Sequence, residues 1–225
     1  MSKKYPITVS SWTLGDQCTF EERVKAAKEA GFEGIGLRAE TYVDALNEGL
    51  FDADILAILE KYDMKATVSI VGAYTDAACE EAEPDPAYSY LDWQDVSVLR
   101  DSGHVEICNH SYDMHNLDGR RGVGQLEGES YEDYRKIFLN DTTKLQTLCD
   151  EHCGFQPNVY TYPFGITCES ASRLVKNMGF EASLGVEEKI NIIKKEDERC
   201  LFGLYRYNRS GIISTEEFMK KVFGA

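Results

Sequence analysis

The chain has 225 residues, of which 43% are hydrophobic and 28% are charged, as expected for one soluble globular domain with a sizeable core. Its net charge of −15 at pH 7 disfavours nucleic acids and anionic membrane surfaces as partners, because proteins bind both through lysine and arginine. A neutral small molecule or a neutral glycan is therefore the expected substrate. Residues 1–6 lack the apolar core of a signal peptide, which predicts a cytoplasmic protein.

The first part of the chain alternates apolar runs with amphipathic segments. Thr19 and Glu22 have the spacing of a capping box and mark the start of a helix. Asp52 is expected to cap the next helix. The acidic stretch that follows contains two prolines and predicts a long loop. We predict strands at residues 5–11, 32–39 and 65–71, a helix at 19–30, and the long loop at 73–91.

The same alternation continues to the end of the chain. We predict helices at residues 92–101, 131–149, 170–177 and 214–222, strands at 105–108, 159–162, 180–184 and 204–207, and a glycine-containing loop at 116–129. Strands that alternate with helices indicate a parallel sheet. Seven or eight such units predict an α/β fold of the (β/α)-barrel type, similar to a TIM barrel. In such barrels the chemistry lies at the carboxyl ends of the strands, so we expect Glu40 and His110 on one face.

A polar turn with two imidazoles follows the predicted strand at 105–108. It holds His110, Asp113 and His115 within six residues. Imidazole is the commonest side-chain ligand of zinc-like metals, and a catalytic site needs two or three protein ligands and an open position. The alternative is a solvated loop that happens to contain two histidines.

Seven cysteines are scattered along the chain without a C-x-x-C pair. Cys149 and Cys153 lie one helical turn apart, which suits neither a zinc ribbon nor an obvious disulfide. We interpret the cysteines as reduced thiols, and a single disulfide remains the alternative.

From about Ala66 to its end, the chain resembles the polysaccharide deacetylase family, the NodB-like carbohydrate esterases. The most specific piece is Asn-His-Ser-Tyr at 109–112, followed by His115. The resemblance implies a barrel in one domain over residues 1–225. The other matching pieces are residues 65–72, 91–96, 101–108 and 160–165.

Residues 1–65 are instead similar to the opening β-α-β of sugar isomerase and epimerase barrels of the xylose isomerase type. The matching pieces are residues 10–16, 20–32 and 34–40. The chain thus resembles a natural or engineered chimera of two parallel barrels. The isomerase family takes most of its catalytic carboxylates from later strands, which this chain has exchanged, so isomerase or epimerase activity is the weakest alternative.

The deacetylase resemblance implies hydrolysis of N-acetyl groups on sugars with a divalent metal, most suitably zinc. His110 would be the first histidine ligand and His115 the second, one residue further along the chain than is usual in the family. The family's Asp-Asp motif is absent before Lys65, and Glu40 takes its place as metal ligand or base, with Asp44 as a weaker substitute. The alternative is that Glu40 is a residue at the mouth of the barrel with no functional role.

Two further pieces complete the resemblance. Residues 162–165 match the motif that builds a groove wall and supplies an oxyanion-binding amide, so Tyr162, Pro163 and Phe164 are expected to bind substrate together with Tyr112. The family's late catalytic histidine is missing, and Arg206 is the candidate electrostatic stabiliser. The implied protein is a deacetylase-like hydrolase with impaired catalytic machinery. The alternative is a non-catalytic barrel that binds glycans, or a fold chimera.

Other polar and aromatic residues have simpler interpretations. His104 is expected to be structural, His152 to lie at a helix end, and Cys108 to belong to the core. Asp113 supports the site or belongs to the loop. Tyr74 lies near a strand end and is a candidate for stacking on a sugar ring.

Overall fold

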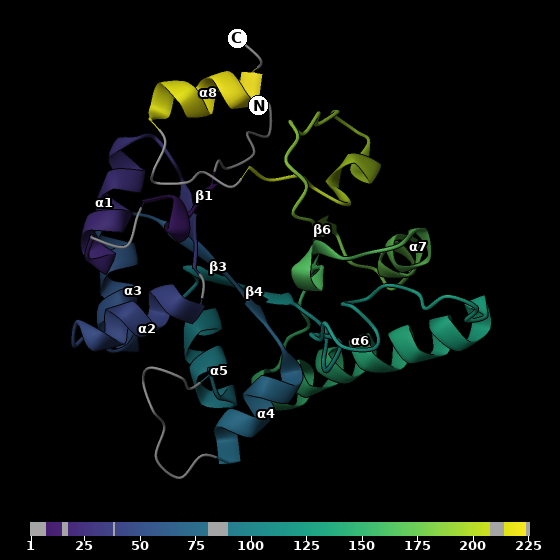
Figure 1. The fold of residues 1–225 in the computed structure, drawn as a ribbon. Coiled ribbons are helices and arrows are strands. Elements are labelled where there is room, and N and C mark those ends of the chain that lie inside the picture. Colours follow the sequence, from purple (N-terminus) through teal and green to yellow (C-terminus); the bar gives the residue numbers. More distant parts are fainter. Residues whose placement is uncertain (1–7, 15–17, 38, 81–89, 208–213, 224–225) are drawn as a thin grey trace. The chain divides into compact units, whose positions relative to one another are not determined.

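A computed structural model describes residues 8–14, 18–37, 39–80, 90–207 and 214–223 (Figure 1). Its contacts divide the chain into two compact units. The first unit comprises residues 1–68, 80–106 and 208–225, and the second comprises residues 69–79 and 107–207.

Six strands follow one another in the sheet in the order of the sequence. Every pair with an assigned register is parallel, namely β1 with β2, β2 with β3, β4 with β5, and β5 with β6. The strands are β1 (Thr8–Ser10), β2 (Gly34–Gly36), β3 (Lys65–Ile70), β4 (Val105–Asn109), β5 (Val159–Thr161) and β6 (Ala182–Leu184). This confirms the predicted parallel α/β architecture, with six strands in the described residues rather than seven or eight.

The first unit contains β1, β2 and the amino ends of β3 and β4. Its α1 begins with the predicted capping box, in which the Glu22 amide donates to Thr19 Oγ1 and the Thr19 amide donates to Glu22 Oε2. A buried stripe that includes Val24, Ala27 and Leu59 packs this unit's core. The helices are α1 (Phe20–Glu29), α2 (Ala39–Asn47), α3 (Asp52–Lys61), α5 (Trp93–Asp101) and α8 (Thr215–Phe223), with the 3-10 helix η1 at Ser11–Leu14.

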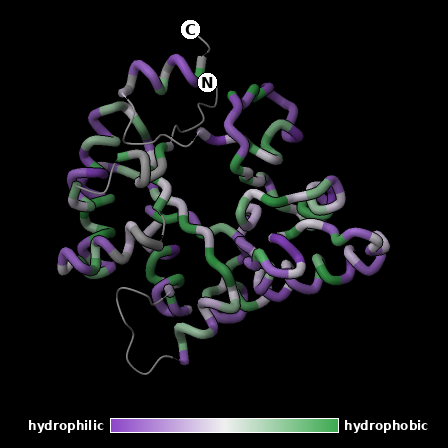
Figure 2. Tube along the Cα trace, viewed as in Figure 1, coloured by the Kyte–Doolittle hydropathy of each residue, from purple (hydrophilic) through white to green (hydrophobic). Residues whose placement is uncertain are grey.

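The second unit contains the carboxyl ends of β3 and β4, together with β5 and β6. Its longest helix, α6 (Tyr131–Cys153), ends at Gly154 in the left-handed conformation. Hydrophobic and hydrophilic residues alternate along α6 (Figure 2), and its buried face joins a core with Tyr160 and Val175. The other helices are α4 (Gly72–Glu80), α7 (Glu169–Asn177), and the 3-10 helices η2 (Pro163–Gly165) and η3 (Glu198–Leu201).

Four local predictions differ from the structure. The strand at 32–39 is only β2, and α2 begins at Ala39, so Glu40 lies in the first turn of a helix instead of at a strand end. The first part of the loop predicted at 73–91 is instead helix α4, since its alanines favour a helix, and residues 81–89 lie outside the described residues. Asp52 is the first residue of α3, and Phe51 is its N-cap. The strand at 204–207 is reduced to a single bridge between Leu184 and Leu204.

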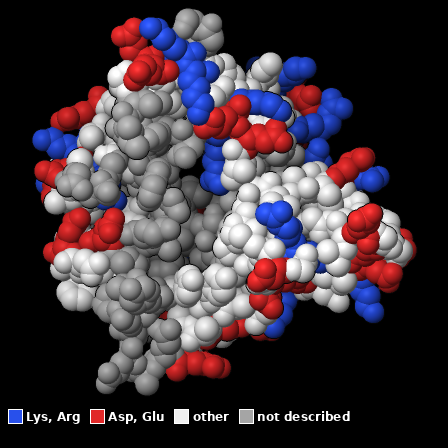
Figure 3. Space-filling view, in the orientation of Figure 1, with Lys and Arg blue, Asp and Glu red and all other residues white. Residues whose placement is uncertain are grey.

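Other expectations concern the whole chain. No disulfide joins any of the seven cysteines, all of which lie in the described part of the chain. Among the described helices, none has both the length and the apolar character needed to span a membrane. Acidic and basic side chains are interspersed over the described part of the face drawn in Figure 3.

Candidate metal centre

The two candidate histidines lie in the second unit, in the loop that leaves the carboxyl end of β4. His110 follows the strand directly, and its amide donates to the Ile70 carbonyl at the end of β3, with N and O 3.0 Å apart. The rings of His110 and His115 have centroids 5.1 Å apart and are tilted by 51°. The structure therefore brings the predicted pair together.

A backbone carbonyl determines the tautomer of His110. Its Nδ1 lies 2.6 Å from the Thr161 carbonyl oxygen, which only accepts hydrogen bonds, so Nδ1 carries the proton and donates. Nε2 therefore keeps a lone pair that can bind a metal, the usual arrangement of metal-binding histidines. Burial lowers the pKa of His110 to about 4 despite this bond, and repulsion from His115 and Arg206 acts in the same direction. The imidazole is accordingly neutral near pH 7.

His115 lies between two aromatic rings. Its ring centroid is 4.2 Å from that of Phe164, with an interplanar angle of 31°. Tyr74 meets it edge-on at 5.8 Å, and the Tyr74 hydroxyl lies 3.5 Å from Nδ1, a long distance for a hydrogen bond. Burial lowers the pKa of His115 below its usual value. Both histidines are therefore held as neutral imidazoles.

The backbone between the histidines is tied to the rest of the second unit. Ser111 has a φ of +74°, and its amide donates to Asn109 Oδ1 at 2.9 Å. The amides of Tyr112 and Asp113 each donate to one carboxylate oxygen of Asp141 on α6, both at 2.8 Å. Burial raises the pKa of Asp141. The Asp113 side chain itself is exposed.

The turn after β5 presents Phe164. Phe164 has a φ of +55° and is 39% exposed, whereas Tyr162 is 1% exposed and Pro163 is buried. The amides of Tyr162, Gly165 and Ile166 donate to the carbonyls of Leu184, Tyr162 and Pro163, respectively. Of the three substrate-binding residues predicted in this turn, Phe164 is thus the one whose side chain a ligand can reach.

The other predicted site residues have varied surroundings. The Tyr112 hydroxyl donates to Asp76, and Lys144 Nζ lies 3.5 Å from the Tyr112 ring centroid. The Tyr112 side chain therefore contacts both α4 and α6. Arg206 is exposed, and its charge contributes to the low pKa of His110. Its backbone amide donates to the Glu187 carbonyl.

The predicted carboxylate belongs to the first unit. The Glu40 side chain lies outside the described residues, so its role as ligand or base stays a prediction. Asp44, the weaker substitute, forms an ion pair with Arg23 at 3.3 Å.

The donor set fits a divalent metal of the zinc type in part. Two neutral imidazoles are suitable ligands, and the Thr161 carbonyl orients that of His110 by accepting a hydrogen bond from Nδ1. Within the described residues, no group of three or more His, Cys, Asp or Glu side chains is arranged to hold a metal ion.

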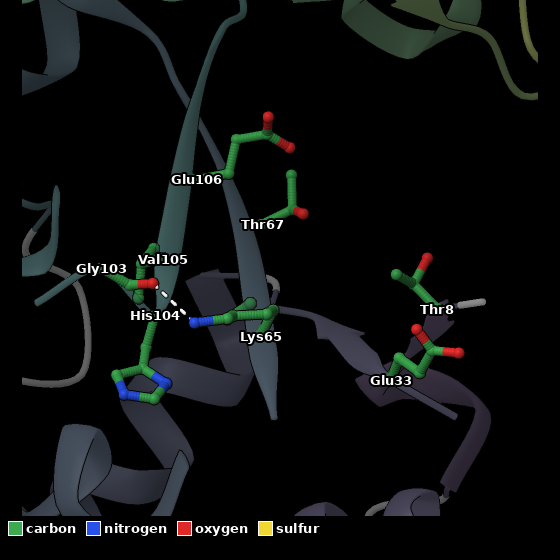
Figure 4. Close-up of a pocket in the computed structure, with 9 residues that line it drawn as sticks. Thr8, Glu33, Lys65, Thr67, Gly103, His104, Val105 and Glu106 are labelled. Atoms are coloured by element: carbon green, nitrogen blue, oxygen red, sulfur yellow. Dashed lines mark hydrogen bonds between the residues drawn. The ribbon is translucent and has the colours of Figure 1, made fainter. Parts of the chain in front are cut away.

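A separate cavity of about 310 Å³ lies in the first unit, at the amino ends of β3 and β4 (Figure 4). Lys65 donates from its ammonium group to the Gly103 carbonyl at 2.8 Å, and His104 Nδ1 lies 3.3 Å from the Met64 carbonyl oxygen. This agrees with a structural role for His104. His152 is exposed in the last turn of α6, and Cys108 is fully buried, as expected for both.

Solved structures of deacetylases share this fold. A de-N-acetylase from Aggregatibacter actinomycetemcomitans superposes with a TM-score of 0.59 at 16% identity, over 88% of this chain and 79% of that one. IcaB from Ammonifex degensii gives 0.60 at 14% identity, over 96% and 94% of the two chains. Streptococcus pyogenes deacetylase PplD, solved with acetate, gives 0.59 at 14% identity, over 97% and 98%. These similarities confirm the NodB-like (β/α)-barrel fold.

The sequence itself gives the family. No curated protein matches this chain. The family model described as polysaccharide deacetylase matches residues 41–183, more than half of the 225 residues. The match begins within the segment that resembles an isomerase, so the idea of a chimera stays a prediction. The chain belongs to the polysaccharide deacetylase family.

Proposed function

We propose that this protein is a metal-dependent hydrolase of N-acetylated carbohydrates with reduced catalytic machinery. One observation carries the proposal. His110 and His115 lie 5.1 Å apart between ring centroids, and the Thr161 carbonyl holds His110 in the tautomer that leaves Nε2 available.

His110 and His115 would hold the metal. The chemistry that a bound divalent metal such as zinc supplies is polarisation of the acetyl carbonyl and a lowered pKa of water. The low pKa of His110 supports this role, because a neutral imidazole needs no deprotonation before it binds.

The remaining residues would bind and orient the substrate. The exposed face of Phe164 offers an apolar surface for a sugar ring beside His115. We assign oxyanion stabilisation to the Phe164 amide, with the Arg206 guanidinium as a further positive charge. No histidine follows His152 to serve as late acid. Because a general acid or base contributes about 10²–10⁴-fold to the rate, we expect slow turnover.

The test measures metal content and acetate release together. Protein purified without an affinity tag is loaded with zinc or cobalt and incubated with N-acetylglucosamine oligomers. We expect about one metal per chain and slow acetate release, both lost in His110→Ala and kept in the control His152→Ala, which changes an exposed histidine. If His110→Ala retains the metal and the activity of the unaltered protein, the proposal is wrong.

A non-catalytic glycan-binding barrel is the second candidate. The observation in its favour is the absence of both the Asp-Asp motif and a late histidine from the sequence. Calorimetric binding of the same oligomers without acetate release, at saturating metal and over long incubation, would favour this candidate.

A further inference from the structure

We propose that Asp141 is a positioning residue for the histidine pair. Its carboxylate, which projects from α6, holds the backbone between His110 and His115 in the conformation that brings the two rings together. This inference rests on the proposed function, because it concerns the same metal-binding loop.

The contacts are short and specific. Asp141 Oδ1 accepts the Tyr112 amide and Oδ2 accepts the Asp113 amide, each at 2.8 Å. Both amides lie between the two histidines in the sequence. The carboxylate therefore binds the middle of the segment that connects His110 to His115. Charge-assisted bonds of this kind are stronger than bonds between neutral groups.

The loop needs such a restraint, because its conformation is unfavourable for an ordinary residue. Ser111 has a φ of +74°, in the left-handed region that favours glycine. The Asn109 side chain restrains Ser111 by accepting a hydrogen bond from the Ser111 amide. Asp141 restrains the next two residues in the same way. Without Asp141, the Tyr112 and Asp113 amides lose their acceptors, and the segment keeps only its other bonds, such as those of the Ala73 amide to the Tyr112 carbonyl and of the Met114 amide to Ser111 Oγ. We expect the position of His115 to be less well fixed as a result.

The partner element is anchored in the core. Helix α6 is buried along Phe138, Thr142 and Leu145, so the position of residue 141 on this helix is well defined. A carboxylate is also the appropriate group, since both of its oxygens accept hydrogen bonds and neither donates. An asparagine of nearly equal size would direct an NH₂ group at one of the two amides and lose that bond.

The test compares Asp141→Asn with Asp150→Asn. The control removes the same charge from an exposed position of the same helix. Zinc and cobalt affinities are measured by competition with a chelator, and amide exchange of Tyr112 and Asp113 is followed by NMR in metal-free protein. We expect at least a tenfold loss of metal affinity in Asp141→Asn and faster exchange at the amide that faces the new NH₂ group, with no change in the control.

A second variant covers the case in which Asp141→Asn does not fold. Asp141→Glu keeps both acceptors and the charge but displaces them by one methylene, so a smaller loss of affinity is expected. Urea unfolding of each variant separates a local effect on the loop from a global loss of stability.

The readouts distinguish the two proposals. If the unaltered protein binds no metal that His110→Ala removes, the proposed function fails, and the amide exchange of Asp141→Asn still decides whether Asp141 holds the loop. If Asp141→Asn leaves both metal affinity and amide exchange unchanged, Asp141 has no positioning role.

Discussion

Gly165 lies in the turn that presents Phe164, and replacement by alanine tests how tightly this turn is built. Gly165 has a φ of +68°, and a Cβ added there would lie 2.0 Å from Val186 Cγ2 and 2.8 Å from Val186 Cβ. The left-handed conformation costs an alanine about 1–2 kcal/mol. Displacing a neighbour from an overpacked site costs about 1–3 kcal/mol. Because Val186 is 42% exposed and has room to move, we expect a total loss of about 2–4 kcal/mol.

Gly154 provides a matched control for the backbone cost. Its φ is +67°, and a Cβ added there meets nothing within 4 Å. Gly154→Ala should therefore show the conformational cost alone. The extra loss in Gly165→Ala should shrink when Val186→Ala is added, because this change removes the γ-methyl groups at 2.0 and 2.8 Å from the new Cβ and leaves only the Val186 Cβ at 2.8 Å.

Urea unfolding at equilibrium measures these differences as shifts of the midpoint at constant slope. The reasoning about this turn is refuted if Gly165→Ala is no more destabilising than Gly154→Ala. It is also refuted if Val186→Ala destabilises the Gly165→Ala protein as much as it destabilises the unaltered one.

Three further changes follow from individual contacts. In metal-free protein, the free energy of unfolding should fall by up to about 3 kcal/mol as the pH drops from 6.5 to about 4. The reason is that His110 becomes protonated in the unfolded state in this pH range and stays neutral in the folded state. If the free energy of unfolding of His110→Asn falls as steeply with pH, His110 is not the origin of the change. Arg120→Met should lower the free energy of unfolding, measured by heat or urea, by about 2–4 kcal/mol, because it leaves the largely buried Glu129 without its paired guanidinium. Adding Glu129→Gln to Arg120→Met should restore part of this stability. If it restores none, the ion pair is not the source of the loss. Thr19→Ala should cost about 1 kcal/mol through loss of the capping box, while Thr19→Ser stays near the unaltered value; equal losses in both variants would point to packing of the threonine methyl group instead.

Features that depend on neighbours in the sequence were predicted well. The capping box at Thr19 begins α1 as expected, and the alternation of apolar runs with amphipathic segments indicates the parallel sheet. His110 and His115 are also close in the sequence, within one loop, so their proximity in space was expected. These features are local, because caps, periodicity and short loops involve residues a few positions apart.

The missed helices show where local reasoning was insufficient. Strand β2 ends at Gly36 and helix α2 begins at Ala39, and no N-cap residue or proline precedes the helix, so residues 32–39 were predicted as a single strand. This error put Glu40 at a strand end, whereas it lies in the first turn of α2. Tertiary packing, which buries Thr41 and Ala45 on one side of α2, decides between helix and strand here.

The sequence by itself determined the family motifs, the alternation of parallel strands with helices and the identity of the two imidazoles. Only the tertiary structure decided how those imidazoles are held. Thr161 lies 51 residues from His110, and Asp141 lies 29 residues from Tyr112, yet both accept hydrogen bonds from the loop. Such partners have no fixed spacing in the chain, because folding of the sheet and packing of α6 bring them together. The physical reason is that a hydrogen bond depends on distance in space, which the sequence specifies only through the whole fold.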